Sequence, residues 1–358
     1  MYDVNKIKNK IICGDVIKEL KKIPDKSIDV IFADPPYYMQ TNGELIRVEG
    51  NKFNGVEDNW DKFNSYNEYD KFSFNWLKEC RRILKDNGTI WVIGSFQNIY
   101  RIGFIMQNLG FWILNDIIWS KLNPVPNFRG VRFTNAHETM LWCSKSKKSK
   151  YTFNYKTMKF LNNNKQERSV WNIGICIGNE RLKGEDGKKA HSTQKPINLL
   201  KKVILSSTNP NDLVLDPFMG TGTTGAVAKE MKRNYIGIDN NKDYVKLAEK
   251  RIASVKEINN EIYQLILDKK IPRVSMKELL NKGYLKVGQK LYDKNMTVVV
   301  EITNDGKVKD NLEILSIHQM SAKYLKLQNN NGWDYWYISK NKPLDDLRKR
   351  YRKEQLNV

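Results

Sequence analysis

The stretch Ile28–Tyr37, IDVIFADPPY, decides the fold. Its first six residues are almost all apolar and lie between polar segments, which predicts a strand buried on both faces of a sheet. An acid, two prolines and a tyrosine follow that strand directly. Because open α/β sheets bind ligands beyond the carboxyl ends of their strands, this turn is the first candidate site.

The chemistry of the turn suits an exocyclic amino group on a planar base. Pro35 and Pro36 carry no backbone N–H and fix the chain, so that the Pro35 carbonyl can point outward. Asp34 and that carbonyl then form a pair of acceptors, with the Tyr37 ring as a flat wall beside them. The alternative is an ordinary strand-ending turn in which Asp34 caps a helix.

A second motif, DPFMGTGTT at Asp216–Thr224, follows the predicted strand Asp212–Leu215 and opens a predicted helix. Gly220 and Gly222 let the backbone approach a ligand closely. The free N–H groups at a helix start bind carboxylates and phosphates. The motif therefore predicts a cofactor-binding loop.

Two cofactors compete for this loop. The stretch Gly220–Gly225 fits the dinucleotide pattern GxGxxG, so an NAD-dependent oxidoreductase is one alternative. Asp239, at the end of the next predicted strand, is placed to accept hydrogen bonds from ribose hydroxyls. The Asp-Pro-Phe start, the late position in the chain and the pairing with Asp34–Tyr37 favour S-adenosylmethionine.

Outward from these motifs, buried strands and amphipathic helices alternate. Strands are predicted at 8–13, 89–93, 111–119, 139–143 and 234–239, helices at 16–23, 76–84, 99–109, 196–207, 223–231 and 244–270, and a turn at 86–88. The alternation predicts a Rossmann-like α/β catalytic domain over residues 1–260, with a mostly parallel sheet covered on both faces. Strands at 297–303 and 333–339 and a hairpin turn at 304–306 predict a small α+β domain over residues 271–358.

The chain is strongly basic, with 61 Lys and Arg against 40 Asp and Glu and a formal net charge of +21. Residues 121–190 carry +10 and residues 242–358 carry +9. This favours a polyanionic partner, with nucleic acid the default, although Lys-rich solvated faces are the simple alternative. The first basic segment is the candidate target-recognition region, in which Arg129 and Arg132 are candidates to contact base edges. The polar stretch Met39–Asn59 is a candidate loop to close on DNA.

The scattered cysteines and histidines exclude several other classes. Four cysteines without a CxxC pair and three distant histidines predict no disulfide framework and no metal site. No apolar run approaches the roughly 20 residues of a membrane span, and the N-terminus is too polar for a signal peptide. These features indicate a cytoplasmic protein.

Together the two motifs resemble those of the amino-group DNA methyltransferases. Asp-Pro-Pro-Tyr is the usual catalytic motif of the adenine-N6 enzymes in that family, and the order of the two motifs is that of its β class. The resemblance runs through the whole chain and is closest to the HinfI-type and CcrM-type enzymes, which methylate adenine in GANTC. Further stretches that carry it are KKAHSTQKP at 188–196, SIHQMSAKYL at 316–325 and NNNGWDYWYI at 329–338.

The resemblance implies roles for single residues. Asp15 would bind the cofactor adenine, Lys195 would lie near its methionine, and Phe218 would pack on it; a simple turn aspartate and a core aromatic are the alternatives for Asp15 and Phe218. The implied cofactor-binding set also contains Asp216, Gly220, Thr221, Gly222, Thr223 and Asp239. Ser316, Asn331 and Trp333 would lie at the DNA surface of the C-terminal domain, although Trp333 in a Gly-Trp turn also suits the core of a small domain.

The implied activity is methyl transfer from S-adenosylmethionine, without a metal, to N6 of adenine in duplex DNA. A base inside a duplex cannot present its amino group to such a site, so it must be flipped out. Cytosine-N4 or RNA methylation, an NAD-dependent oxidoreductase and a non-catalytic DNA-binding protein are the alternatives. The GANTC site is implied by resemblance alone. A homodimer is common among relatives, although the sequence does not fix the oligomeric state.

Overall fold

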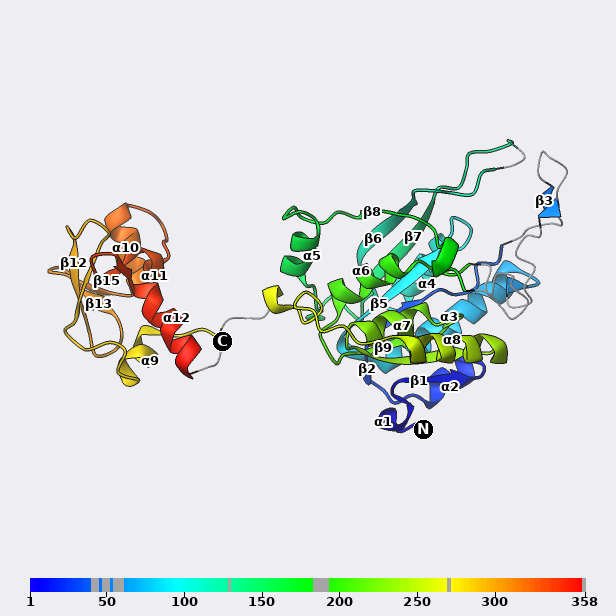
Figure 1. Ribbon diagram of the computed structural model, residues 1–358, viewed down its shortest axis with the longest axis horizontal. Coiled ribbons are helices and arrows are strands. Elements are labelled where there is room, and N and C mark those ends of the chain that lie inside the picture. Colours follow the sequence, from blue (N-terminus) through cyan, green and yellow to red (C-terminus); the bar gives the residue numbers. More distant parts are fainter. Residues whose placement is uncertain are drawn as a thin grey trace. The chain divides into compact units, whose positions relative to one another are not determined.

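The computed structural model describes residues 1–39, 45–46, 52–53, 61–127, 130–182, 193–268 and 272–355. The chain divides into two compact units, Met1–Asp268 and Lys269–Val358 (Figure 1). No helix among the described residues is long and apolar enough to cross a bilayer.

The first unit is built on an eight-stranded sheet. In sheet order the strands are β1 (Lys10–Cys13), β10 (Asn234–Asp239), β9 (Leu213–Asp216), β2 (Ile28–Ala33), β5 (Leu84–Gly94), β7 (His137–Ser144), β6 (Trp112–Lys121) and β8 (Val170–Ile173). All neighbours pair in parallel except that β7 runs antiparallel to β5 and β6. The predicted mostly parallel sheet is thus confirmed.

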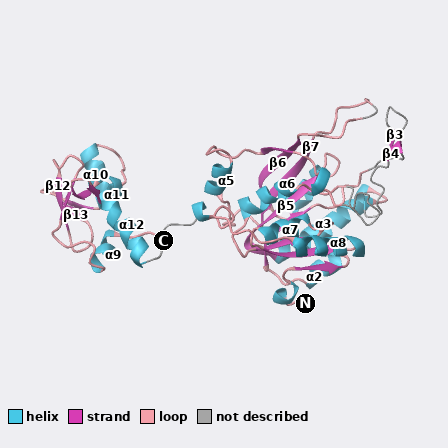
Figure 2. Cartoon of the chain, viewed as in Figure 1, coloured by secondary structure: helices cyan, strands magenta, loops and turns pink. Residues whose placement is uncertain are grey.

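Helices cover both faces of this sheet (Figure 2). They are α1 (Val4–Ile7), α2 (Val16–Lys22), α3 (Tyr66–Ile83), α4 (Ile99–Asn108), α5 (Tyr155–Leu161), α6 (Ile197–Ser207), α7 (Thr223–Glu230) and α8 (Lys242–Ser254), with 3-10 turns at Gly178–Glu180 and Ile266–Asp268. A separate pair, β3 (Leu45–Ile46) and β4 (Lys52–Phe53), is antiparallel.

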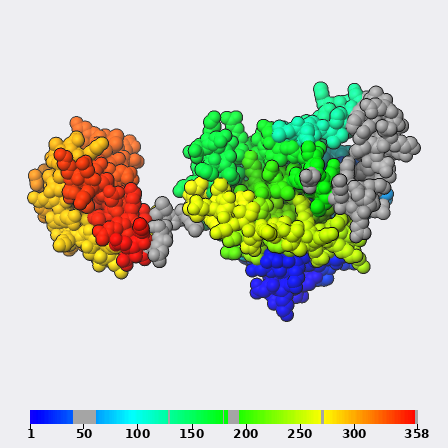
Figure 3. Space-filling view, in the orientation of Figure 1, coloured from blue at the N-terminus to red at the C-terminus, as the bar shows by residue number. Residues whose placement is uncertain are grey.

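The alternation of side chains along β2 explains this layering. Ile31 and Ala33 pack into one apolar cluster with α2, α3 and α4, whereas Val30 and Phe32 pack into another with α6 and α7. Because successive side chains of a strand point to opposite faces, a continuous apolar run is buried on both sides. Segments far apart in sequence meet at the edge, where β1 pairs with β10 and the N-terminal residues lie against the region of α8 (Figure 3).

Three of the elements predicted up to residue 270 were wrong in part. The turn predicted at 86–88 lies within β5, where the pairing shifts from Ile28↔Leu84 to Val30↔Thr89; the turn-forming residues are accommodated as a bulge in the strand. Helix α3 begins at Tyr66, well before the predicted start, because the Ser65 side chain caps it by accepting from the Glu68 N–H. The predicted helix 244–270 ends early, since α8 stops at Ser254.

The second unit contains a six-stranded antiparallel sheet. In sheet order its strands are β14 (Ile314–Leu315), β13 (Val308–Lys309), β12 (Val299–Ile302), β11 (Lys290–Tyr292), β15 (Tyr337–Ser339) and β16 (Lys342–Pro343), and its helices are α9 (Met276–Asn281), α10 (Ile317–Leu325), α11 (Gly332–Tyr335) and α12 (Leu344–Gln355). The predicted hairpin turn at 304–306 joins β12 to β13. The predicted strand 333–339 was wrong in its first half, because the Asn331 side chain caps α11 there.

Candidate active site

Four acidic residues converge at the carboxyl ends of four neighbouring strands. Asp15 comes shortly after β1, Asp239 and Asp216 end β10 and β9, and Asp34 follows β2. All four line one cavity of about 290 Å3. Within this sheet, the next strand in sequence after β2 is β5, which lies on one side of the β9–β2 pair. The next strand after β9 is β10, which lies on the other side, so the strand order diverges between β9 and β2. Such a switch point is where open α/β sheets bind ligands.

Asp61 holds the backbone that follows β2. Its buried carboxylate accepts hydrogen bonds from the N–H groups of Tyr37, Tyr38 and Met39, at 2.6, 2.7 and 2.7 Å. The Tyr69 hydroxyl donates to the Pro36 carbonyl at 2.9 Å. The Asp34–Tyr37 turn is therefore fixed from two sides.

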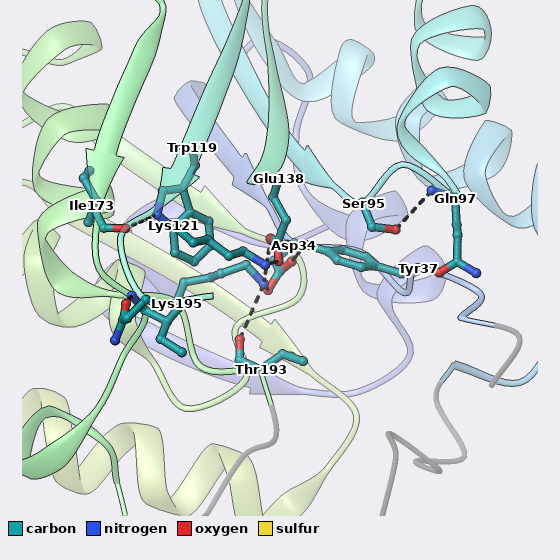
Figure 4. A network of polar contacts seen from close by, with 12 residues as sticks. Asp34, Tyr37, Ser95, Gln97, Trp119, Lys121, Glu138, Ile173, Thr193 and Lys195 are labelled. Carbon is teal, nitrogen blue, oxygen red and sulfur yellow. Dashed lines mark hydrogen bonds and ion pairs between the residues drawn. The ribbon is translucent and has the colours of Figure 1, made fainter. Parts of the chain in front are cut away.

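A polar network surrounds the side chain of Asp34 (Figure 4). Lys195 Nζ lies 2.8 Å from Asp34 Oδ2 and 3.8 Å from Glu138 Oε2. The Tyr37 hydroxyl lies 2.9 Å from Asp34 Oδ1 and 3.1 Å from Glu138 Oε2. Lys121 Nζ donates to Glu138 Oε1 at 2.7 Å. Lys121 and Lys195 reach this point from one side and Tyr37 from the other.

The network shifts the pKa values of its members. Burial raises the pKa of Asp34, and the positive charge of Lys195 opposes that rise. Burial alone would also raise the pKa of Glu138, but Lys195 and Lys121 lower it below its ordinary value. Burial favours the neutral form of Lys195, yet Asp34 and Glu138 raise its pKa. The result is a largely buried set of two carboxylates and two ammonium groups, whose side chains are 7–18% exposed.

Both glycines of the loop adopt the left-handed backbone conformation that favours glycine. Gly220 and Gly222 have φ of +51° and +77°, and α7 starts at Thr223. A Cβ on Gly222 would lie 2.7 Å from the Ala248 Cβ. Asp239 Oδ2 accepts from the Gly220 N–H at 2.8 Å, which ties the loop to the end of β10.

Asp216 stabilises the start of this loop from within. Its Oδ1 accepts from the Phe218 N–H at 3.0 Å, and its Oδ2 accepts from the Thr224 hydroxyl at 2.5 Å. Burial raises the pKa of Asp216 to about 7. Its carboxyl group therefore serves the loop's own structure.

The other residues implied for the cofactor line the same cavity. Asp15 also caps α2 by accepting from the Lys18 N–H at 2.9 Å. The Phe218 ring packs edge-on against Trp76, with centroids 5.2 Å apart. Thr221 is buried, and the Thr223 hydroxyl lies 2.7 Å from Arg251 Nη1. Lys195 lines the cavity too, but its ammonium group is bonded to Asp34.

The residues implied for DNA have different environments. Arg129 and nearly all of the stretch 40–59 lie outside the described residues, whereas Arg132 is exposed and its guanidinium lies 5.6 Å from the Phe96 ring centroid. Ser316 and Asn331 are N-caps of α10 and α11. Trp333 was expected at the DNA surface, but only 5% of it is exposed. It packs into the core of the second unit beneath Arg348, which was the alternative.

Sequence reasoning missed Asp61, Lys121 and Glu138. Lys121 ends β6 and Glu138 is the second residue of β7, so both lie at strand ends near a loop. A charged residue at the end of an apolar strand was the available signal, but it is common at surfaces. Tyr37 also differs from the expected open wall, since it is 7% exposed and its hydroxyl faces two carboxylates.

Comparisons with known proteins agree with this geometry. The DNA methylase family model matches residues 28–250, and a model described as Restriction Enzyme Adenine Methylase Associated matches residues 266–357. The chain is 63% identical over 352 residues to the type II methyltransferase M.HinfI of Haemophilus influenzae, and this match covers 98% of each chain. It is 44% identical over 243 residues to the type II methyltransferase M2.LlaDCHI of Lactococcus lactis subsp. cremoris, and this match covers 68% of this chain and 88% of that protein.

The fold is also found among solved structures. The crystal structure of the M1.HpyAVI–SAM complex matches with a TM-score of 0.51 and 29% identity, over 68% of this chain and 98% of that one. These matches exclude the oxidoreductase and the non-catalytic DNA-binding protein as alternatives. The chain belongs to the DNA methylase family.

Proposed function

We propose that this protein transfers a methyl group from S-adenosylmethionine to N6 of adenine in duplex DNA, at GANTC, after the base has been flipped out. One observation carries the proposal: the Asp34–Tyr37 turn lines the same cavity as Gly220 and Thr221 of the glycine loop. An acceptor site for an amino group thus adjoins a loop suited to the cofactor. The 63% identity to a type II methyltransferase and the match to an adenine-methylase-associated model support it.

The residues of the cavity fit S-adenosylmethionine. Gly220 and Thr221 line the cavity, and the N-terminus of α7 suits the methionine carboxylate. Asp239 and Asp15 are acceptors for the ribose hydroxyls and the adenine, and the Phe218 ring offers an apolar face. When bound, the cofactor supplies a methyl group already activated on a sulfonium.

Asp34 and the Pro35 carbonyl act on the adenine amino group. Its lone pair is delocalised into the ring, which makes it a poor nucleophile. Hydrogen bonds from the two N–H groups to these acceptors pull the nitrogen toward tetrahedral geometry and localise the pair. Asp34 serves as an ionised acceptor, not as a nucleophile, and the ion pair with Lys195 favours that charged form. Positioning then supplies much of the rate.

The free-energy cost of base flipping must be offset by contacts between the DNA and the protein. Unpairing costs a few kcal/mol. Stacking on an open aromatic ring returns roughly 1–3 kcal/mol, of which Tyr37, a cavity residue that is only 7% exposed, supplies at most a part. We assign the rest to the basic segments 121–190 and 242–358, with Arg129, Arg132, Ser316 and Asn331 as candidate contacts. The catalytic domain is assigned to residues 1–260 and a DNA-binding domain to residues 271–358. A homodimer in the cytoplasm is the expected state.

The test combines labelled S-adenosylmethionine with duplexes that carry GANTC, GATC or neither, without added metal, followed by mass analysis of the nucleosides. N6-methyladenine in the GANTC duplex alone is the expected result. Transfer to another duplex would keep the reaction and discard the GANTC assignment. N4-methylcytosine, or transfer only to RNA, would replace adenine in DNA as the substrate. A protein that does not bind S-adenosylmethionine would contradict the assignment of the glycine loop.

A further inference from the structure

One hydroxyl group stands between two carboxylates in this site. The Tyr37 O–H is within hydrogen-bond distance of Asp34 Oδ1, at 2.9 Å, and of Glu138 Oε2, at 3.1 Å. A phenol has a single proton to donate, so it can serve only one of them at a time. The two carboxylates are therefore alternative acceptors for the same proton.

The surrounding charges make Glu138 a permanent acceptor. Lys121 donates to its Oε1 at 2.7 Å, and Lys195 lies 3.8 Å from its Oε2. The side chains of Glu138 and Lys121 are 12% and 14% exposed, so water screens this pair little. Both lysines lower the pKa of Glu138, which keeps it ionised.

The requirements on Asp34 differ from those on Glu138. In the proposed reaction Asp34 accepts a hydrogen bond from the adenine amino group, while Lys195 occupies its Oδ2. The Tyr37 hydroxyl, 2.9 Å from Oδ1, then takes up one of the two lone pairs on the oxygen that is left for the amino group. A buried hydroxyl that loses its partner destabilises the site by its full desolvation penalty. Glu138 removes that penalty, because the same hydroxyl can donate to it instead.

We propose that Glu138 is a positioning residue that holds Tyr37 by its hydroxyl while Asp34 accepts from the adenine amino group. Lys121 fixes Glu138 in turn. The pair comes from the base of the β6–β7 hairpin, where Trp119 faces Glu138 in register and the Lys121 N–H donates to the Ala136 carbonyl at 2.8 Å. This role rests on the proposed adenine methylation and adds a residue that acts through Tyr37, not on the substrate.

A double-mutant cycle on the full-length protein tests the proposal. The variants are Glu138→Gln, Tyr37→Phe and the double variant, assayed in single-turnover methyl transfer to a GANTC duplex. Each single variant is expected to lower the rate constant about tenfold, because Tyr37→Phe removes the donor hydroxyl and Glu138→Gln removes the negative charge of its acceptor. The double variant should lose less than about twofold beyond Tyr37→Phe, because Glu138 acts through that hydroxyl. Binding of S-adenosylmethionine should stay within about twofold of wild type.

Glu79→Gln is the matched control. Glu79 forms an equally short ion pair with Arg82 on α3, at 2.7 Å, but does not line the cavity. A wild-type rate for Glu138→Gln, or losses that multiply fully in the double variant, would overturn the proposal. If Glu138→Gln does not fold, Lys121→Met replaces it in the cycle, with the same expected coupling to Tyr37→Phe. A wild-type protein that methylates no adenine would instead contradict the proposed function.

Discussion

Lys195 Nζ lies 2.8 Å from Asp34 Oδ2, although 161 residues separate them in the sequence. The pair joins the residue that follows β2 to the segment just before α6, and its side chains are 18% and 7% exposed. Asp34 lies in a site that favours its neutral form, and Lys195 favours its charged form. The ammonium group therefore keeps the proposed acceptor available.

Lys195→Met should make methyl transfer depend on a higher pH. Without the ammonium group, burial and the negative charge of Glu138 raise the pKa of Asp34 further, so that less of it is ionised at any given pH. The expected loss at pH 7 is about tenfold or more, recovered in part as the pH rises. The measurement is kcat between pH 6 and 9.5. Lys195→Arg keeps the charge and should keep the wild-type profile; coinciding profiles for wild type and Lys195→Met would contradict this role.

Asp61→Ala should destabilise the protein and weaken catalysis more than stability alone explains. Three N–H groups donate to its buried carboxylate, and hydrogen bonds to a charged group contribute about 1.5–3 kcal/mol. Urea unfolding should show a loss of that order. Methyl transfer per folded molecule should also fall, because the turn that carries Asp34 is no longer fixed.

The control for Asp61 is Asp70→Asn. Asp70 forms an ion pair with Arg101 that is about one-third exposed, and such pairs contribute about 0–1 kcal/mol. It should lower stability slightly and leave the rate per folded molecule unchanged. Equal losses of activity in both variants would mean that the Asp61 hydrogen bonds do not position the turn.

The strand and turn of Ile28–Tyr37 could be predicted because their signals are local. An apolar run forms a buried strand wherever it lies in the sheet, and prolines fix the turn by their own chemistry. Glu138 could not be found in this way. It reaches Tyr37 only because β7 lies between β5 and β6, and nothing in its own neighbourhood specifies that strand order.

Trp333 shows the same limit in the second unit. Its Asn-Gly-Trp context indicates a turn but does not say which way the indole points. The Asn331 cap starts a short helix that directs the ring into the core, where Arg348 covers it. Burial depends on which elements pack against the turn, and these are α10, which precedes it, and α12, which follows it.

Asp216→Asn should change how stability depends on pH. Burial raises the pKa of Asp216 to about 7 in the folded protein, well above the ordinary value of an unfolded aspartate. Between about pH 4 and 7 the folded state then binds more protons than the unfolded state, so the free energy of unfolding falls as the pH rises. Urea unfolding at pH 5 and pH 8 should show a smaller fall for the variant. A fall equal to that of wild type would mean that Asp216 is not the titrating group.

Gly222→Ala should destabilise the first unit more than the same substitution at a glycine with open surroundings. An alanine at Gly222 would be strained by the φ of +77°, and its Cβ would lie 2.7 Å from the Ala248 Cβ. Gly178 also has a positive φ, of +59°, but a Cβ there would meet nothing within 4 Å. We expect a loss of about 1–2 kcal/mol for Gly178→Ala from the backbone alone, and about 2–4 kcal/mol for Gly222→Ala, where overpacking adds to it.

Thermal unfolding and titration with S-adenosylmethionine separate the two effects. Gly222→Ala should also weaken cofactor binding, because α8 and the glycine loop must move apart to make room for the alanine Cβ. Gly178→Ala should bind the cofactor as wild type does. Equal stability losses in the two variants would show that the loop relaxes without strain, and that the positive φ, not the close packing on Ala248, is what requires glycine at this position.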